Sequence, residues 1–420
     1  MAKLESPEYL NNEFIQTALE NYLCCNEVKI NEFVISNLVS GSGENYCSDI
    51  YEIKVKYQLL DGDGEQRENV VVKSMPKHKQ IVLRNLKIYN RELYFYKNIL
   101  PQMETLMKIK DKEYVLGPRL YYNISKPVET LVFQNLNPLG FHLQSRQNGL
   151  DKIHSLEVLQ KLAQYHALSL SLNERDDNLF SNIMQRYPFG LLNMDSCKSD
   201  SFKALFGAQL LKLIELLKTD SQIELDTIKK LENYYAHFTE RVLKSVYPLK
   251  GQLNVLNHGD LWVNNLMFCY GSKDDSRPTE VRFIDFQLSF YGSLGFDVNY
   301  FLNTSVQLDV LKHNRSELID TYTNTLLQTL EALPYPMALQ PTKKQIQQEI
   351  HEKEAYGFFV AFAFFPLMSM FATDSHDNSL EKLKDAKFAE QKIQLMFTSN
   401  KRTIETLKFN IKRLEQLGIL

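Results

Sequence analysis

One short segment carries residues suited to acid–base and metal chemistry. Residues 256–265 read Leu-Asn-His-Gly-Asp-Leu-Trp-Val-Asn-Asn, which places Asp260 directly after a His-Gly pair and Asn265 five residues later. A second acidic residue, Asp285, follows twenty positions further on, within Phe-Ile-Asp-Phe-Gln. A carboxylate can accept a proton, and carboxylate and amide oxygens are hard ligands of the kind that Mg²⁺ prefers. The spacing therefore indicates proton transfer beside a metal ion, as in phosphoryl transfer.

The order of the three residues is that of a kinase active site. In that arrangement Asp260 accepts the proton of the attacking hydroxyl, while Asn265 and Asp285 bind Mg²⁺. Taken singly, an Asp or Asn in a loop is typical of a turn or a helix cap. The prediction therefore depends on the joint pattern and its apolar flanks. We expect His258 to brace the loop rather than to act as the base.

Upstream of this segment lie candidate partners for the phosphates of ATP. The run Val-Val-Val-Lys places Lys73 on a predicted strand, and Glu92 follows 19 residues later on a predicted helix. The Glu92 carboxylate would hold Lys73 against the α- and β-phosphates. Alone, Lys73 is typical of a solvated strand lysine and Glu92 of a helix surface. Their position before Asp260 favours the functional interpretation.

Two further segments are candidates for nucleotide binding. Residues 41–48 read Gly-Ser-Gly-Glu-Asn-Tyr-Cys-Ser between two predicted strands, although paired glycines are also usual in hairpins. The segment ending at Leu136 takes the position of a kinase hinge, whose backbone binds adenine. The predicted nucleotide-binding residues of these two segments are Gly41, Gly43, Asn45, Ser48, Phe133, Gln134 and Asn135.

The elements that must position these residues indicate an α+β fold with two lobes. Strand patterns and one predicted helix form a small β-rich N-lobe, and helical periodicity dominates the rest of the chain. A strand-loop-strand insert at 253–290 carries Asp260 and Asp285. We expect the N-lobe at 1–136, a C-lobe at 137–420 and a connecting hinge at 137–150. Strands are expected near 33–39, 50–57, 69–73, 114–122 and 129–133, and helices near 80–99, 205–218, 225–242, 315–332, 344–371 and 380–416.

Composition excludes several classes of protein. The net charge of −3 over 420 residues gives no reason to expect nucleic-acid binding, and no pair among the five cysteines has zinc-site spacing. The start of the chain shows no apolar signal segment. The apolar run 355–371 is short for a membrane span and contains Pro366, so we expect a buried helix that ends or kinks there. These features predict a cytoplasmic protein with no nucleic-acid or membrane partner.

Together these motifs resemble the ecdysteroid kinase-like family of small-molecule kinases, which is related to choline kinases and aminoglycoside phosphotransferases. The resemblance covers about residues 30–400 and is closest at 258–265 and 284–287. It implies a protein-kinase-like bilobal fold, ATP with Mg²⁺, and phosphorylation of a hydroxyl on a small molecule. It also implies that Asp297 anchors the catalytic loop through backbone amides. One departure is Gln134-Asn135, where the family often has Glu-Asp.

The nature of the substrate can be argued separately. Only eleven residues separate Asp285 from Asp297, which leaves no room for the segment that docks polypeptides in protein kinases. A small substrate is therefore expected, with an ecdysteroid or related lipophilic alcohol implied by the resemblance. A choline- or ethanolamine-type kinase and a ligand-binding pseudokinase are the alternatives. The aromatic run 356–371 could line a steroid pocket, but such runs are more often plain core.

Overall fold

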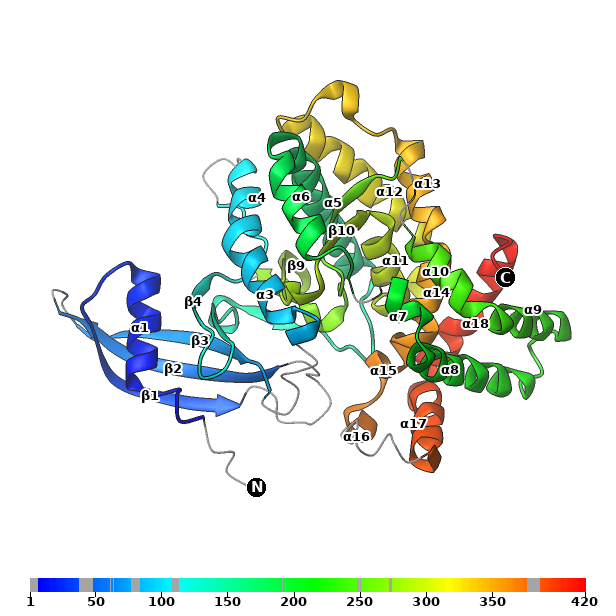
Figure 1. The fold of residues 1–420 in the computed structure, drawn as a ribbon, viewed down its shortest axis with the longest axis horizontal. Coiled ribbons are helices and arrows are strands. Elements are labelled where there is room, and N and C mark those ends of the chain that lie inside the picture. Colours follow the sequence, from blue (N-terminus) through cyan, green and yellow to red (C-terminus); the bar gives the residue numbers. More distant parts are fainter. Residues whose placement is uncertain are drawn as a thin grey trace.

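The computed structural model describes residues 7–37, 48–60, 62, 64–76, 84–107, 113–190, 192, 194–247, 249, 251–271, 274–375 and 386–420. A small β-sheet lobe lies at one end of the molecule and a larger helical lobe at the other (Figure 1). The strands of the small lobe are β1 (Val28–Asn37), β2 (Asp49–Leu59), β3 (Gln66–Ser74), β4 (Leu120–Ile124) and β5 (Thr130–Gln134). They form one antiparallel sheet in the order β1-β2-β3-β5-β4. The mixed α+β class is thus as predicted.

Helix α1 (Asn12–Leu23) covers one face of this sheet and was not predicted. Alternate residues of β2 point to this face, where Ile53 and Val55 are buried with Ile15 and Leu19 of the helix. The Asn11 side chain accepts the main-chain N–H of Phe14 and so caps the first turn. The helix therefore follows from a cap and an apolar stripe, although the sequence prediction placed only one helix in this lobe.

The helix predicted at 80–99 differs from the observed structure. Helix α3 (Ile88–Tyr94) continues into the π-helical segment η2 (Phe95–Ile99), and α4 (Leu100–Leu106) follows without a break. The helical path therefore passes Pro101 instead of stopping before it. Because Pro101 lies in the first turn of α4, its missing N–H costs no intrahelical hydrogen bond.

The helical lobe packs two long helices against each other, α5 (Lys152–Arg175) and α12 (Leu308–Ala332). The single helix predicted at 225–242 is in fact two, which meet at His237, and Leu225 is 80% exposed rather than buried. The other helices of this lobe are α6 (Asp177–Arg186), α7 (Met194–Lys198), α8 (Asp200–Lys218), α9 (Leu225–Ala236), α10 (Phe238–Val246), α11 (Gly295–Thr304), α13 (Lys343–Glu352), α14 (Glu354–Ala363), α15 (Phe365–Ser369), α16 (Ala372–Ser375), α17 (Ala386–Thr398) and α18 (Lys401–Gln416).

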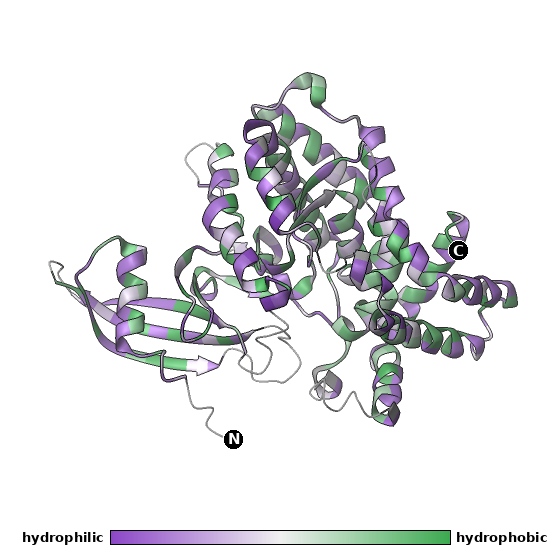
Figure 2. Ribbon diagram, viewed as in Figure 1, coloured by the Kyte–Doolittle hydropathy of each residue, from purple (hydrophilic) through white to green (hydrophobic). Residues whose placement is uncertain are grey.

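The apolar run 355–371 is buried inside the helical lobe. Helix α14 ends at Ala363 and α15 begins anew with Pro366 in its first turn, which confirms the predicted break. Phe358, Phe359 and Phe362 are at most 1% exposed, so they are core rather than pocket lining. Figure 2 shows polar and apolar residues interleaved along helices such as α8 and α9. Of the helices in the described residues, none has the length and apolar character needed to cross a bilayer.

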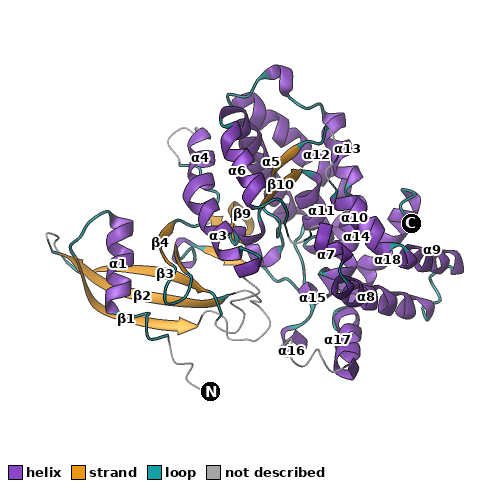
Figure 3. Ribbon diagram, in the orientation of Figure 1, coloured by secondary structure: helices purple, strands orange, loops and turns teal. Residues whose placement is uncertain are grey.

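Two small sheets carry the segments singled out by the sequence, and the strand β10 of one of them lies among the helices of the larger lobe (Figure 3). One pairs β7 (Asn254–Asn257) with β10 (Phe290–Ser293). The other has the order β6-β8-β9 and is built from β6 (Phe141–Leu143), β8 (Leu266–Gly271) and β9 (Asp274–Phe283). The chain between β7 and β8 holds Asp260 and Asn265, and Asp285 follows β9. This is the predicted strand-loop-strand insert.

Candidate active site

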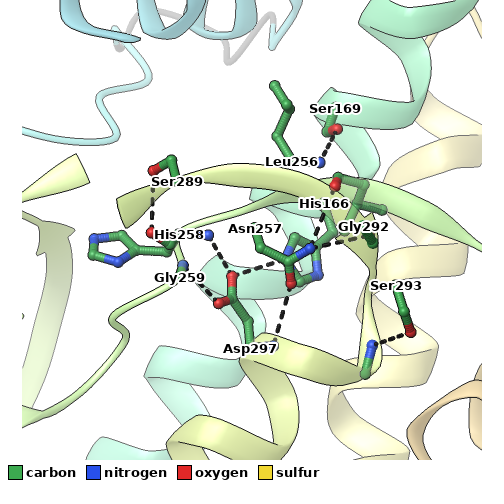
Figure 4. A network of polar contacts seen from close by, with 12 residues as sticks. His166, Ser169, Leu256, Asn257, His258, Gly259, Ser289, Gly292, Ser293 and Asp297 are labelled. Atoms are coloured by element: carbon green, nitrogen blue, oxygen red, sulfur yellow. Dashed lines mark hydrogen bonds and ion pairs between the residues drawn. The ribbon is translucent and has the colours of Figure 1, made fainter. Parts of the chain in front are cut away.

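The catalytic loop candidate follows β7 and begins with His258 and Gly259. Gly259 has φ +81°, and a Cβ there would lie 2.2 Å from the carbonyl oxygen of Leu288, so only glycine fits. The main-chain N–H groups of His258 and Gly259 donate to the two oxygens of Asp297, at 2.6 and 2.9 Å (Figure 4). Asp297 is 1% exposed. Its carboxylate thus holds the loop in the way that the family resemblance implied.

His258 is a structural part of this loop. Its ring is fully buried, and Nε2 lies 3.0 Å from the carbonyl oxygen of Ile284. Burial lowers the pKa of His258, against the opposing effects of Asp297 and Asp285, so the neutral ring is favoured. The main-chain carbonyl of His258 also accepts the hydroxyl of Ser289. These contacts agree with the predicted bracing role.

Asp260 is held at both ends of its carboxylate. Tyr300 donates its hydroxyl to Oδ1 at 2.7 Å, and the side-chain amide of Asn265 donates to Oδ2 at 3.1 Å. Burial and then the nearby charge of Asp285 raise the pKa of Asp260 to about 7, although the two hydrogen bonds and Lys73 oppose this. A carboxylate with a pKa near neutrality is well matched to the task of a general base.

Asn265 and Asp285 have oxygens suited to a metal ion. The amide nitrogen of Asn265 donates to the main-chain carbonyl of Asp260 (2.8 Å) as well as to its carboxylate, which turns the amide oxygen away from these contacts. Asp285 has φ +69°, a left-handed conformation that is rare for a residue with a side chain and common at functional sites. Both residues therefore fit the hard-oxygen preference of Mg²⁺.

The set of protein ligands is incomplete by itself. The described part of the chain contains no group of three or more His, Cys, Asp and Glu side chains that could hold a metal ion. Such a site is expected where one or two protein oxygens bind Mg²⁺ and nucleotide phosphates and water complete the shell. The oxygens of Asn265 and Asp285 thus fit such a partly protein-bound Mg²⁺ ion.

Lys73 connects three elements of the candidate nucleotide site. From β3 its Nζ donates to Glu92 on α3 at 2.7 Å and to Asp285 at 2.8 Å, with Gln287 Oε1 at 3.4 Å. Burial disfavours the ammonium, but Asp285 and Glu92 outweigh it and raise the pKa of Lys73. Burial raises the pKa of Glu92 to about 7 against the pull of Lys73, since one ammonium serves two carboxylates. The predicted pairing of Lys73 with Glu92 is thus present in the structure.

The remaining predicted nucleotide-binding residues lie in two segments, one before β2 and one at the end of β5. Gly41, Gly43 and Asn45 lie outside the described residues, and Ser48 is partly buried just before β2. Phe133 and Gln134 end β5 opposite β3, and Asn135 follows them.

The side chain of Asn135 is used within the protein rather than offered to a ligand. Its amide nitrogen donates to Glu52 at 2.8 Å, and its amide oxygen accepts the N–H of Asn137 at 3.0 Å. Phe133 is 5% exposed and packs on Tyr96. The side chains of Phe133 and Asn135 are therefore both used within the protein, and their predicted role in nucleotide binding would fall to the backbone.

Sequence reasoning missed Tyr300. It lies on α11, three residues and almost one helical turn after Asp297, so both side chains leave the same face of the helix. The sequence did contain a signal for Tyr300. Asp297 was expected to anchor the catalytic loop, and a residue one helical turn after that anchor lies close to Asp260. A contact across forty residues could not be assigned from spacing alone.

The β-sheet lobe and the helical lobe together give a mixed α+β, kinase-like fold. The sequence matches the model of the ecdysteroid kinase-like family over residues 42–335, which is more than half of the chain. The chain therefore belongs to this family, whose members are small-molecule kinases. No curated protein matches the sequence.

Two solved structures align with this chain at low similarity. An ethanolamine kinase from Plasmodium vivax aligns with a TM-score of 0.42 and 12% identity, over 100% of this chain and 93% of that one. A macrolide 2′-phosphotransferase from Brachybacterium faecium aligns with a TM-score of 0.32 and 11% identity, over 83% of this chain and 92% of that one. Similarity at this level carries no information about the substrate.

Proposed function

We propose that this protein is an ATP-dependent kinase that phosphorylates a hydroxyl group of a small molecule. The observation that carries the proposal is the state of Asp260. Its carboxylate is held by Tyr300 and Asn265, lies near Asp285, and has a pKa raised to about 7. A binding module would have no need of a buried, oriented and basic carboxylate beside metal-binding oxygens.

The proposed step is in-line transfer of the γ-phosphoryl group. The substrate oxygen forms a bond to the γ-phosphorus, the bond from phosphorus to the β,γ-bridging oxygen breaks, and ADP leaves. Asp260 takes the proton of the substrate hydroxyl, and Lys73 would neutralise phosphate charge. Asn265 and Asp285 would hold Mg²⁺, which supplies further positive charge to the phosphates when it is bound.

The backbone after β5 fits an adenine edge. The N–H groups of Gln134, Asn135 and Asn137 already donate to protein acceptors. Within the described part of the chain, the N–H of Leu136 donates to no main-chain carbonyl. Beside it lies a small apolar cluster, defined by Leu136, Phe141, Met267, Cys269 and Ile284. A free main-chain donor next to an apolar surface is what a purine ring requires.

A small substrate is favoured by the course of the chain after Asp285. This stretch forms a short 3₁₀ turn, Phe286–Leu288, and then β10, which pairs back onto β7 with Phe290 opposite Asn257. Helix α11 follows at once. The connection is thus folded against the catalytic loop and leaves no extended surface for a polypeptide.

The surroundings of Asp260 favour an apolar substrate. Trp262, two residues after Asp260, and Phe290 are only partly buried and pack on the apolar core of the helical lobe. An ecdysteroid or related lipophilic alcohol fits such walls. The same aromatic faces would also attract a quaternary ammonium ion, so a choline- or ethanolamine-type substrate is the second candidate.

The test is a kinase assay with ATP, Mg²⁺ and three substrate classes, namely ecdysteroids, choline or ethanolamine, and plant or microbial alcohols, with mass spectrometry for the gain of a phosphate.

For the accepted substrate, Asp260→Asn should lower kcat about 10³-fold and leave ATP binding intact, because it removes the base. Asp309→Asn on the exposed surface of α12 is the matched control. Wild-type turnover by Asp260→Asn would show that Asp260 is not the base. Phosphorylation of choline alone would remove the steroid proposal, and no transfer to any class would leave a pseudokinase.

A further inference from the structure

Among the described residues, two side chains donate to the carboxylate of Asp260. One is Asn265 in the loop itself, and the other is Tyr300 in the core of the helical lobe. Its hydroxyl lies 2.7 Å from Oδ1, while Asn265 occupies Oδ2 from the loop itself. Tyr300 is 2% exposed, so water does not compete for this hydrogen bond. The carboxylate plane is therefore set by two donors, one on each oxygen.

The helix that carries Tyr300 is rigidly placed. All ten residues of α11 are buried, and α11 packs closely on α14 where Gly357 allows the approach. A Cβ at Gly357 would lie 2.6 Å from Nδ2 of Asn303 and 3.1 Å from Oδ1 of Asn299. Because any larger residue would push the helices apart, the position of the Tyr300 hydroxyl is fixed by helix packing.

The same helix also holds the backbone of the loop. Asp297 accepts the N–H groups of His258 and Gly259, and Tyr300 reaches the Asp260 side chain from the next turn. Backbone and side chain of consecutive loop residues are thus positioned by one rigid element. The Asn265 contact alone could not do this, since Asn265 belongs to the same loop and would move with it.

We propose that Tyr300 is a positioning residue that fixes the rotamer of Asp260 so that the carboxylate faces the substrate hydroxyl. The proposal rests on the proposed role of Asp260 as the base. Tyr300 acts as a donor throughout, since burial and then Asp260 raise its pKa well above the ordinary value and keep the hydroxyl protonated. It takes no proton itself.

The first test is Tyr300→Phe, which removes one oxygen and keeps the buried ring. We expect kcat to fall about tenfold or more, the size of a lost hydrogen bond to a charged group, with KM for ATP and for the alcohol nearly unchanged. Tyr114→Phe is the matched control, because it removes a buried hydroxyl that donates to Gln164 at 2.9 Å, outside the site. Equal kcat losses in the two variants would overturn the proposal.

The second test asks whether Tyr300 acts through Asp260. In a double-mutant cycle, adding Tyr300→Phe to Asp260→Asn should lower the residual rate less than about twofold, because there is no base left to position. Multiplicative losses would show a separate structural effect and overturn the proposal. If Asp260→Asn itself keeps wild-type turnover, the proposed function loses its base, which is a different failure.

The melting temperatures of Tyr300→Phe and Tyr114→Phe show whether Tyr300→Phe is poorly folded. If it is, a more conservative replacement of Tyr300 tests the proposal instead. Tyr300→p-aminophenylalanine keeps the ring and places a neutral N–H donor at the same point. It should restore kcat to within about threefold of wild type, as expected when an equivalent hydrogen bond is re-formed. Failure to restore kcat in a folded protein would contradict the positioning role.

Discussion

The two sides of the candidate site are held together by different forces. On the nucleotide side, Lys73, Glu92 and Asp285 come from three separate elements and meet through ion pairs of 2.7 and 2.8 Å. On the loop side, the residues involved lie within one stretch of about forty residues and meet through hydrogen bonds. Asp297 accepts the main-chain N–H groups of His258 and Gly259, and Tyr300 donates to the carboxylate of Asp260. The nucleotide side therefore depends on how the two lobes are placed, whereas the loop side depends on packing inside one lobe.

The difference in charge has a chemical consequence. The nucleotide side holds two carboxylates, Glu92 and Asp285, around the one ammonium of Lys73. The second carboxylate would favour the binding of a cation, in line with the Mg²⁺ that we propose to bind there with ATP. On the loop side, the carboxylate of Asp260, the proposed base, is held by a hydrogen bond on each oxygen.

After Asp260→Asn, the variant expected to lose the most activity is Lys73→Met. It removes the ammonium that joins the buried carboxylate of Glu92 to the partly buried carboxylate of Asp285 and so leaves the two carboxylates without this shared partner. We expect kcat/KM for ATP to fall about 100-fold, which steady-state kinetics would measure. Lys54→Met, on the exposed side of the neighbouring strand, is the control. An unchanged kcat/KM for ATP would mean that the nucleotide does not use this lysine.

A smaller effect is expected from Asp297→Asn on the loop side. The amide keeps one acceptor, so one of the two loop N–H groups loses its partner in a fully buried place. We expect kcat to fall about tenfold and stability to fall by about 2 kcal/mol, while ATP binding stays close to wild type. Steady-state kinetics would measure kcat, nucleotide titration would measure ATP binding, and chemical unfolding would measure stability. Loss of ATP binding in a folded variant would show that the two sides are coupled more tightly than proposed.

The smallest effect on activity is expected from Glu354→Gln, which tests packing of the helical lobe away from the site. Glu354 on α14 pairs with Arg315 at 2.8 Å and with Arg413 at 2.6 Å. Burial alone would raise its pKa, but the two arginines outweigh burial and lower it. Since the folded pKa lies below the unfolded value of about 4.3, the pair stabilises the protein fully above that value.

The stability difference between wild type and Glu354→Gln should therefore depend on pH. It should be about 3 kcal/mol at pH 7, the cost of breaking a buried pair, and should shrink as the pH falls below about 4 and the carboxylate of the wild type is protonated. Chemical unfolding at pH values from 7 to 3 measures it, with Glu317→Gln as the control on the exposed surface of α12. A constant difference over this range would mean that Glu354 does not titrate with folding.

Much of the fold was predictable where neighbouring residues decide the structure. The strands predicted at 50–57 and 69–73, the insert at 253–290 and the helix break near Pro366 all follow local patterns, and the structure confirms them. The errors also have local causes. The π-helical turn at Phe95–Ile99 allows the chain to pass Pro101, and His237 divides a continuous apolar stripe into two helices. The spacing of apolar residues along the sequence reveals neither the π-helical turn nor the helix boundary.

The chemistry that we propose was predictable from the sequence alone, because Asp260, Asn265 and Asp285 lie close along the chain and their spacing limits the roles open to them. Only the tertiary structure decided which distant groups support them. Lys73 meets Asp285 across 212 positions, and Tyr300 reaches Asp260 from a different helix. Such contacts depend on the packing of whole lobes and helices, which involves many weak interactions at once, so spacing along the chain cannot reveal them.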